Sequence, residues 1–347
     1  MSGLQVALLE DGGNPRSPEA VRETGDGFLL APFSEDGDAN YKFRLDVELV
    51  NEGPGPVEAT FVVEWDDEAY SRHRHYVLLT RGEAWRRLPA AIEGTRAVAR
   101  LAVPPGRSHL SMHPPYNHAR LVRLAGALGA DALRVRSIGR SLRGRDILAI
   151  EAGPADARPL VLQARAHPYE SVGSFLLDGM VRWLDAGSPE ARALVMGRRV
   201  VLLPMPNPDG VAEGTCKRTL GGLDLNEAAA SDEPEGVALT AFYREVRPRS
   251  TFDIHGFMHN SDGFGTSDPV RGQAICDALS ARTELFDKKF GFRHRREPEG
   301  GLANPGALAE HEFGSVRFGG AFTWRDRNAE HLRRMGVELL RAYAAQF

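Results

Sequence analysis

The sequence predicts two domains, a small all-β sandwich over residues 1–117 and an α/β domain over residues 118–347. Three observations lead to this fold class. A chain of 347 residues, of which 42% are hydrophobic, is long enough to fill two cores. Its first third contains short segments in which apolar and polar residues alternate, as in half-buried strands. After residue 118, apolar strands alternate with helical patterns, which indicates a sheet with helices on both faces.

The first domain is expected to consist of short strands separated by turns. Residues 42–49 alternate strictly, with charged side chains at even positions and apolar ones at odd positions, so residues 41–50 are predicted to form a half-buried strand. The Asn, Gly and Pro residues of 51–56 form a turn before the next strand, at 57–65. Further strands are expected at 76–79 and 97–103, and the two prolines at 114–115 mark the end of the domain.

The second domain is expected to alternate strands and helices, and a helix closes the chain. Strands are predicted at 146–151, 159–163, 199–203, 250–254 and 319–324, and helices at 121–128, 171–184, 236–246 and 329–347. In the last helix, Leu332, Met335 and Leu339 recur at helical spacing, which places them on one face.

Composition argues against several classes of partner. The 43 basic and 47 acidic residues give a net charge of −4, which offers no reason to expect nucleic acid or an acidic membrane. No apolar run approaches the ~18 residues of a transmembrane helix, and the N-terminal residues lack the pattern of a signal peptide. Cys216 and Cys276 do not make a disulfide framework. We therefore expect a cytoplasmic protein, and the sequence does not indicate its oligomeric state.

The strongest chemical signal is His167-Pro168-Tyr169-Glu170, directly after a predicted strand and directly before a predicted helix. Zinc prefers imidazole nitrogen and carboxylate oxygen, and its catalytic sites keep one position open beside three protein ligands. A His and a Glu three residues apart in such a turn can both face one metal ion. Alone, however, the spacing is weak evidence, because a polar helix start is the plainer interpretation.

A third ligand is available in His255, which follows another predicted strand in Asp253-Ile254-His255-Gly256. Functional residues of α/β sheets gather at the carboxyl ends of the strands, where His167 and His255 are both expected. Asp253 is either a partner that orients His255 or a purely structural residue.

Five short motifs follow one another over residues 137–256. They are S-x-G-x-S-x-x-G-R at 137–145, H-P-x-E-S at 167–171, N-P-D-G at 207–210, D-L-N at 224–226 and D-x-H-G at 253–256. Together with a lone Arg at 218, this ordered set resembles the zinc carboxypeptidases. Pro115-Tyr116 near the domain junction makes the resemblance closest to the cytosolic carboxypeptidase branch. The resemblance implies a mixed sheet of the eight-stranded type, preceded by a β-sandwich.

The same resemblance implies a zinc-dependent hydrolase of a peptide or small acyl-amide, with one zinc ion as cofactor. It implies that His167, Glu170 and His255 hold this ion. It also assigns Arg218 to the developing oxyanion, Asn226 to the terminal group of the substrate and Arg145 to a neighbouring part of the cleft.

Two positions depart from the family pattern. The family follows D-L-N with an Arg that binds the substrate carboxylate, and here this residue is Glu227. The family carries its catalytic Glu in a late T-x-E motif, and here the corresponding residue is Arg325. We hypothesise that this is a reciprocal exchange and that both side chains face one cavity, because a lone buried charge of either sign would be costly. In the sharper form Glu227 is the general base and Arg325 takes the substrate carboxylate; in the other form the two merely pair and activity is altered or lost.

Weaker candidates complete the sequence-based picture. Asp326 is the reserve base and Glu312 a distant third. His259 could support a second metal, although a loop residue is the plainer interpretation. The basic run at 293–296 is expected to be a solvated loop, with selection of acidic substrates as the alternative. The alternative to an enzyme is a catalytically inactive homologue that binds a ligand or partner.

Overall fold

The computed structural model describes residues 3–33, 44–65, 76–129, 133–256, 262–287, 289–295 and 301–347. The chain forms two compact units. The first contains residues 1–118 and 210–222, and the second contains residues 119–209 and 223–347. The division at 118/119 lies beside the boundary expected from the sequence, whereas the return of 210–222 to the first unit was not predicted.

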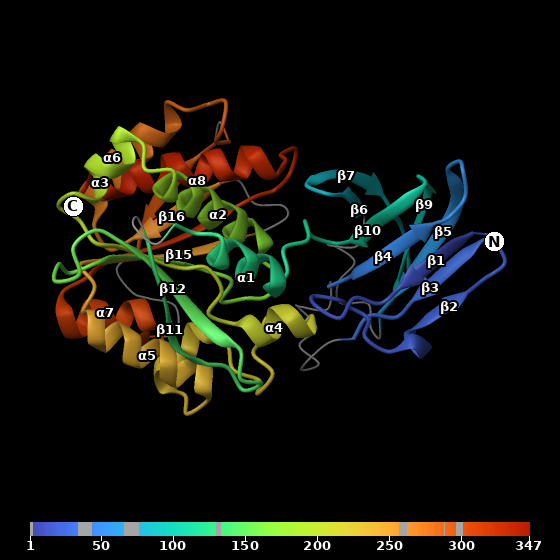
Figure 1. Cartoon of the computed structure of the whole chain (residues 1–347), viewed down its shortest axis with the longest axis horizontal. Helices are drawn as coiled ribbons and strands as arrows, with labels where there is room; N and C mark the ends of the chain where they lie inside the picture. The colour runs from blue at the N-terminus through green and yellow to red at the C-terminus, as the bar shows by residue number, and fades with distance from the viewer. Residues whose placement is uncertain are drawn as a thin grey trace. The chain divides into compact units, whose positions relative to one another are not determined.

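The first unit consists of two five-stranded sheets, seen around the end marked N in Figure 1. One sheet has the order β1-β4-β10-β6-β7 and contains β1 (Leu4–Ala7), β4 (Asp46–Asn51), β6 (Tyr76–Arg81), β7 (Ala84–Pro89) and β10 (Gly106–Ser111). The other has the order β2-β3-β5-β9-β8 and contains β2 (Val21–Glu23), β3 (Gly27–Leu30), β5 (Val57–Glu64), β8 (Ala91–Glu93) and β9 (Arg96–Val103), with the 3-10 helix η1 (Pro18–Ala20) before β2.

Both sheets of the first unit contribute to one hydrophobic core. Val47 and Leu49 of β4 point into it from one sheet, and Phe61 and Val63 of β5 from the other. Because these positions alternate along each strand, every second side chain is buried, as the sequence pattern indicated. The predicted all-β sandwich is confirmed.

The charged face of the predicted strand at 41–50 differs from the expectation of a half-buried strand. Arg44 is buried, and its guanidinium donates to the carbonyl oxygens of Gly12 and Thr215, each at 3.1 Å. Asn14 donates to the carbonyl oxygen of Gly214 at 3.2 Å. The segment 210–222 is therefore held in the first unit by hydrogen bonds between distant parts of the chain, which local periodicity cannot reveal. Residues 34–43, which include the start of the predicted strand, lie outside the described part.

The second unit is built on an eight-stranded mixed sheet, as the family resemblance implied. Its order is β11-β12-β14-β13-β15-β18-β16-β17. The strands are β11 (Arg134–Arg140), β12 (Asp146–Ala152), β13 (Leu160–Ala164), β14 (Val200–Leu203), β15 (Ser250–Gly256), β16 (Gly263–Thr266), β17 (Gly291–His294) and β18 (Val316–Phe322). The central strands β14, β13, β15 and β18 are parallel, and β12 and β16 pair with this group in the antiparallel sense.

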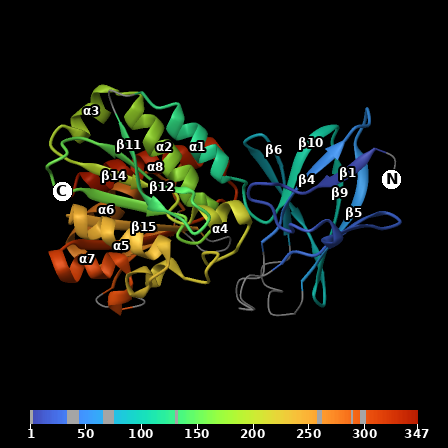
Figure 2. The same cartoon turned by 60° about the horizontal axis from the view of Figure 1, so that its bottom comes forward.

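Helices cover both faces of this sheet (Figures 1 and 2), as predicted. On one face α2 (Ser171–Asp185) packs against α8 (Ala329–Ala344), and on the other lie α5 (Pro234–Val246) and α7 (Pro305–Phe313). The remaining helices are α1 (His118–Gly126), α3 (Pro189–Val195), α4 (Pro208–Glu213), α6 (Pro269–Ser280) and the 3-10 helices η4 (Leu225–Ala230) and η5 (Gly301–Ala303). Gly179 of α2 and Gly336 of α8 allow a close approach, because a Cβ on either would overlap a carbonyl oxygen of the other helix.

The helices α3, α6 and α7 were not predicted, although the sequence carries a start signal for each. Ser188, Asp268 and Asn304 accept hydrogen bonds from main-chain N–H groups in the first turn, and each is followed by a proline. A capping residue followed by Pro is favourable at a helix start, because Pro has no N–H to satisfy. Within the described part of the chain, no helix combines the length and apolar content needed to cross a membrane.

Candidate metal centre

The turn between β13 and α2 carries His167 and Glu170, two of the three predicted ligands. Arg165 in this turn has a φ of 63°, a left-handed conformation that is uncommon outside glycine. Its buried guanidinium donates to Ser174 Oγ at 3.0 Å, in the first turn of α2. This bond ties the turn to the helix that follows and so fixes the path of the chain through the two ligand positions.

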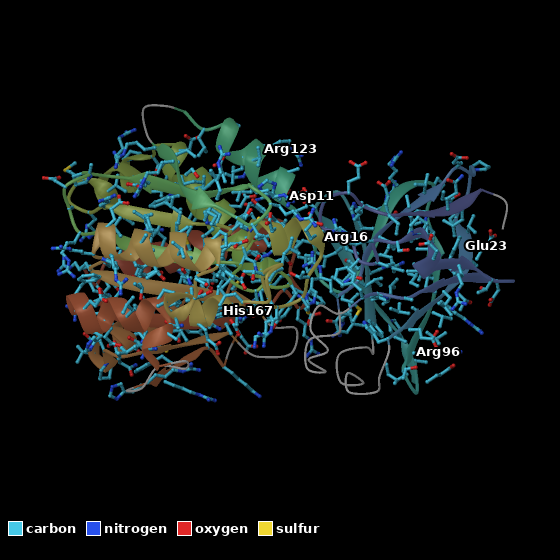
Figure 3. The ribbon with its side chains drawn as sticks, turned by 90° about the horizontal axis from the view of Figure 1, so that it is seen from below. Asp11, Arg16, Glu23, Arg96, Arg123 and His167 are labelled. Carbon is cyan, nitrogen blue, oxygen red and sulfur yellow. The ribbon has the colours of Figure 1, made fainter. Side chains whose placement is uncertain are left out.

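The third predicted ligand comes from the neighbouring strand. β13 and β15 are parallel with Ala164 opposite Ile254, so His255 lies at the same edge of the sheet as the turn. Glu170 lies between the two imidazoles, with Oε1 3.0 Å from Nδ1 of His167 and Oε2 2.8 Å from Nδ1 of His255. One ligand atom from each residue lies within 4.8 Å of the others (His167 is labelled in Figure 3). The structure therefore brings together the three side chains that the sequence singled out.

Two further carboxylates hold the outer nitrogens of the imidazoles. Asp224 Oδ1 lies 3.2 Å from Nε2 of His167, and Asp253 Oδ2 lies 3.1 Å from Nε2 of His255. A carboxylate on the far nitrogen fixes the ring and its tautomer, and makes Nδ1 the nitrogen that faces a metal ion. Asp253 was an open alternative in the sequence and takes the orienting position. Asp224 was overlooked, although it opens the D-L-N motif.

The charges of the cluster reinforce one another. Burial lowers the pKa of His167, but the carboxylates of Glu170 and Asp224 outweigh burial and raise this pKa to about 8. Burial raises the pKa of Glu170, but the two imidazoles outweigh burial and lower it to about 2. The pKa of His255 is raised well above its ordinary value, because Asp253 and Glu170 overcome the effect of burial. Two nitrogens and one carboxylate, each buried or nearly so, make a donor set that fits zinc with a fourth position open.

The orienting carboxylates lead to a first prediction. Asp253→Asn is expected to weaken zinc binding by about 10- to 100-fold, since an amide holds the ring less firmly and lowers the basicity of the ligand nitrogen. Competition with a chromophoric chelator measures the affinity. Asp277→Asn, on the exposed side of α6, is the matched control and is expected to bind zinc as the native chain does. Equal affinity in both variants would leave Asp253 with a structural role only.

The D-L-N motif brings Asn226 and Glu227 beside the cluster. The Asn226 amide lies 3.2 Å from Nε2 of His167. Glu227 follows in η4 with a non-helical conformation, and its side chain is exposed. In the described residues its carboxylate takes part in no ion pair.

Residues after β18 leave the sheet at the same edge, because Gly256 of β15 lies opposite Phe322 of β18. Arg325 is half exposed, and its Nε lies 3.6 Å from a carboxylate oxygen of the neighbouring Asp326. The hypothesis of a Glu227–Arg325 ion pair is therefore not met in the part of the chain that the structure describes. A carboxylate on the next residue pairs with Arg325 at little cost in chain entropy, and residue identity alone cannot exclude that partner. Asp326 itself is exposed and has a φ of 57°.

Buried acids hold the loop that carries Arg145. Asp209 accepts the main-chain N–H of Arg143 at 2.6 Å and the guanidinium of Arg145 at 2.7 Å. Glu235, at the start of α5, accepts the N–H of Leu142 at 3.2 Å. Arg145 is thus fixed by a carboxylate from the N-P-D-G motif. The part played by Glu235 has no signal in the sequence, because it depends on the packing of α5 against β11.

The buried Glu235 leads to a prediction on stability. Burial and the nearby Asp209 raise the pKa of Glu235 above its ordinary value. A raised pKa means that the folded chain favours the protonated acid, so this group lowers stability as the pH rises through its folded pKa. Glu235→Gln still accepts the N–H of Leu142 and is expected to be more stable than the native chain at about pH 8, with no difference at about pH 4. Urea unfolding at both pH values checks this, and Glu284→Gln on the exposed surface is expected to show no such pH dependence.

Two further candidates from the sequence, Arg218 and Glu312, belong to other segments of the chain. Arg218 belongs to the segment 210–222 of the first unit, where its guanidinium donates to the carbonyl oxygen of Gly222 at 2.8 Å. Glu312 pairs with Arg244 at 3.0 Å in the last turn of α7, before β18 begins and thus at the edge opposite His255. The interpretation of Glu312 as a possible base near the metal is therefore wrong.

Two weaker candidates from the sequence remain, His259 and the basic run at 293–296. His259 lies outside the described residues. The run at 293–296 was expected to be a loop, but Arg293 and His294 belong to β17, which pairs with β16 through main-chain hydrogen bonds. Both side chains are exposed, so their charge did not prevent an edge strand from forming.

Comparisons with known proteins agree with this geometry. Residues 126–226 match the model of the zinc carboxypeptidase family. Cytosolic carboxypeptidase 1 of Danio rerio is 31% identical over 187 residues, which cover 51% of this chain and 16% of that protein. Human cytosolic carboxypeptidase 2 is 35% identical over 101 residues, which cover 27% of this chain and 11% of that protein. The chain thus aligns with only about a sixth of the length of these curated relatives or less.

Solved structures match over nearly the whole chain. A metallo-carboxypeptidase from Burkholderia cenocepacia has a TM-score of 0.81 and 21% identity, and the match covers 99% of this chain and 98% of that one. A metallo-carboxypeptidase from Pseudomonas aeruginosa, in complex with (2-guanidinoethylmercapto)succinic acid, has a TM-score of 0.81 and 20% identity, with 98% of both chains covered. At these identities the likeness shows the fold, which is that of the metallo-carboxypeptidases with an additional all-β unit.

Proposed function

We propose that this chain, whose residues 126–226 match the model of the zinc carboxypeptidase family, is a zinc-dependent hydrolase of a peptide or small acyl-amide bond. The observation that supports this most is the convergence of His167, Glu170 and His255 within 4.8 Å. If His167 and Glu170 were only a polar helix start, there would be no reason for β15 to place His255 beside them. Nor would there be a reason for a carboxylate to contact the outer nitrogen of each imidazole. The low cysteine content, only Cys216 and Cys276, agrees with the proposed cytoplasmic location.

The residues in and around the centre would have different chemical roles. His167, Glu170 and His255 would hold one zinc ion, while Asp224 and Asp253 orient the two imidazole rings and make them more basic ligands. Zinc, when bound, acidifies a water molecule and polarises a carbonyl group. Arg218 would stabilise the negative charge that develops on the substrate carbonyl oxygen. Arg145 and Asn226 would bind polar groups of the substrate.

A general base must accept the proton of the attacking water. We assign this role to Glu227, with Arg325 as the group that binds the substrate carboxylate and Asp326 as the reserve base. Glu227 is supported by its place next to Asn226, whose amide lies 3.2 Å from His167, and by its carboxylate being unpaired in the described part of the chain. Arg325 is available for this role because its ion pair with Asp326 is long and half exposed, and such a pair contributes little to stability.

The assignment of the base is tested by substitution. Glu227→Gln is expected to lower kcat by about 10²- to 10⁴-fold with zinc retained, because the amide cannot accept the proton. Asp326→Asn, the comparison variant, is expected to lower kcat only slightly. The opposite pattern would transfer the role to Asp326, and turnover unchanged in both variants would contradict the assignment of either residue.

The function itself is tested on the native chain. Purified protein is expected to hydrolyse at least one member of a panel of dipeptides and N-acyl amino acids, to lose this activity with a chelator and to regain it with zinc. Stoichiometric zinc without turnover on any panel member would favour the second candidate, a zinc-binding homologue without catalysis. The observation that favours this candidate is Arg325, which stands where the family has its catalytic Glu.

A further inference from the structure

A row of arginines lies at the edge of the second sheet that is opposite the metal centre. The parallel strands β14, β13 and β15 start in register, with Leu160 opposite both Val200 and Ser250. Arg199 and Arg249 directly precede β14 and β15, and Arg158 lies two residues before β13. Three neighbouring strands thus place guanidinium groups at their amino ends, while the proposed metal ligands follow the carboxyl ends.

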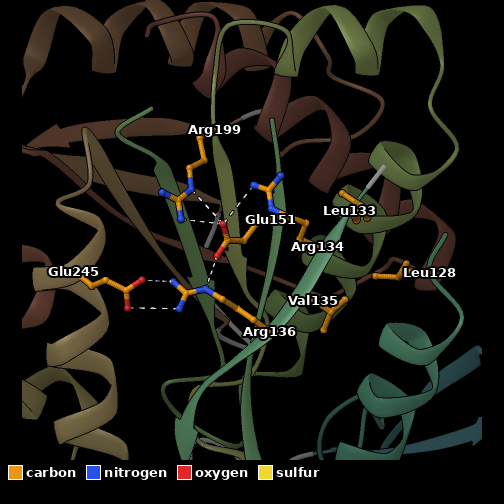
Figure 4. A pocket seen from close by; sticks show the side chains of 8 residues that line it. All are labelled: Leu128, Leu133, Arg134, Val135, Arg136, Glu151, Arg199 and Glu245. Carbon is orange, nitrogen blue, oxygen red and sulfur yellow. Dashed lines mark hydrogen bonds and ion pairs between the residues drawn. The ribbon is translucent and has the colours of Figure 1, made fainter. Parts of the chain in front are cut away.

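Two pockets adjoin at this edge and share Arg199. The smaller one, which we call the arginine pocket, has a volume of about 310 Å³ and is lined by Arg158, Arg198, Arg199 and Arg249. The larger one, about 730 Å³, is shown in Figure 4 and contains Arg134, Arg136 and Arg199 together with Glu151 and Glu245.

The two pockets differ in how their charge is balanced. In Figure 4, Glu151 lies between its arginines, 2.7 Å from Arg136 Nε and 2.9 Å from an Arg199 terminal nitrogen. Burial raises the pKa of Glu151, but Arg136 and Arg199 outweigh burial and keep this pKa below its ordinary value, so the carboxylate is charged at neutral pH. The arginine pocket, by contrast, has four guanidinium groups and no acidic side chain in its lining. Arg199 is balanced by Glu151, and a carboxylate at Phe347 would balance a second guanidinium, which still leaves a positive excess in this pocket on a chain whose net charge is −4.

Main-chain carbonyl groups hold Arg158 in place without neutralising it, whereas Arg199 donates both to the Ala155 carbonyl oxygen and to Glu151, each at 2.9 Å. Arg158 donates to the carbonyl oxygens of Arg247, Pro248 and Phe313 at 2.8–2.9 Å. Arg249 donates to Phe347 at 2.6 Å. The pocket is therefore preorganised, and a ligand does not have to order long flexible side chains.

Arg198 supplies a second, independent observation. Its terminal nitrogen donates to the Leu194 carbonyl at 3.4 Å, but its Nε is buried and has no hydrogen-bond partner among the described residues. A buried donor of a charged group that lacks an acceptor is costly, and an anion bound beside this guanidinium would offset part of that cost through its charge.

We propose that the arginine pocket binds a compact multivalent oxyanion, either a phosphate ester or a small polycarboxylate. The planar fork of Arg matches the oxygens of phosphate and carboxylate groups, with two parallel hydrogen bonds to each. A volume of about 310 Å³ is at the lower end for small-molecule sites, which favours a small, highly charged ligand over a large apolar one. The site is separate from the metal centre and does not depend on catalysis.

Isothermal titration calorimetry of the full chain with pyrophosphate and with citrate tests this proposal. We expect one of the two to bind at a single site, which identifies the ligand as phosphate-like or polycarboxylate. Arg198→Gln and Arg249→Gln are each expected to weaken this binding about tenfold, since each removes a charged donor. Arg123→Gln removes the same charge from α1, labelled in Figure 3, and is expected to leave the Kd unchanged.

The outcomes separate cleanly. Arg198→Gln is the safer variant, because its Nε has no partner to lose within the fold. Two results would overturn the proposal: no heat of binding for either anion at millimolar concentration, or a Kd that is the same in Arg198→Gln, Arg249→Gln and the native chain. An equal loss in Arg123→Gln would also overturn it, because the effect would then follow from net charge alone.

Discussion

Replacing His255 with alanine is expected to reduce bound zinc from about one ion per chain to nearly none and to abolish hydrolysis. Two protein ligands do not hold zinc firmly, and the metal supplies several kcal/mol of stabilisation to the transition state, so the loss in kcat/KM is expected to exceed ~10³-fold. Elemental analysis of the dialysed protein and assays on a substrate of the native chain measure both effects.

The control for this variant is His294→Ala. His294 is an exposed histidine of the same unit, on β17. It is expected to keep both zinc and activity, so a loss specific to His255 reports on the centre and not on the removal of any imidazole. A His255→Ala protein that keeps one firmly bound zinc would show that the three residues are not the ligand set.

Asp262→Ala is expected to lower the free energy of unfolding by about 3–5 kcal/mol, the usual cost of breaking a buried ion pair. Asp262 is fully buried and pairs through both carboxylate oxygens with Arg327, whose side chain is 7% exposed. It also accepts the main-chain N–H groups of Thr323 and Asp287, at 3.1 and 3.0 Å. The variant leaves a buried guanidinium and two N–H groups without their acceptor. Urea unfolding measures the change.

Arg325→Ala is the matched control, because it removes an ion pair from the same loop at an exposed site. Its effect on stability is expected to stay within about 0.5 kcal/mol. The double variant Asp262→Ala/Arg327→Met is expected to recover part of the loss, since it removes the uncompensated charge. A double variant less stable than Asp262→Ala would contradict this account.

The sequence predicted those features of the fold and site that depend on local patterns. The apolar strands 199–203 and 250–254 and the helix at 171–184 stood out because burial on both faces leaves few polar residues. The ligands His167 and Glu170 could be found because they share one turn, and His255 because it ends a strand. Short strands such as β16, whose four residues include two glycines, carry too little periodicity to be predicted.

Contacts between distant parts of the chain could not be predicted from local sequence patterns. The burial of Arg44 depends on carbonyl groups of Gly12 and Thr215, far away in sequence. The support of Arg145 depends on Asp209, and that of His167 on Asp224, which the chain brings together only in the folded sheet. In each case both residues are present in the sequence, but local patterns do not reveal that they pair.

Anomalous diffraction at the zinc absorption edge, from crystals of the native chain grown with zinc, tests the central claim most directly. We expect one strong peak enclosed by Nδ1 of His167, the carboxylate of Glu170 and Nδ1 of His255, at bonding distances of about 2.0–2.2 Å. A zinc peak coordinated by other residues, or none at this cluster in a crystal soaked with the metal, would contradict the account.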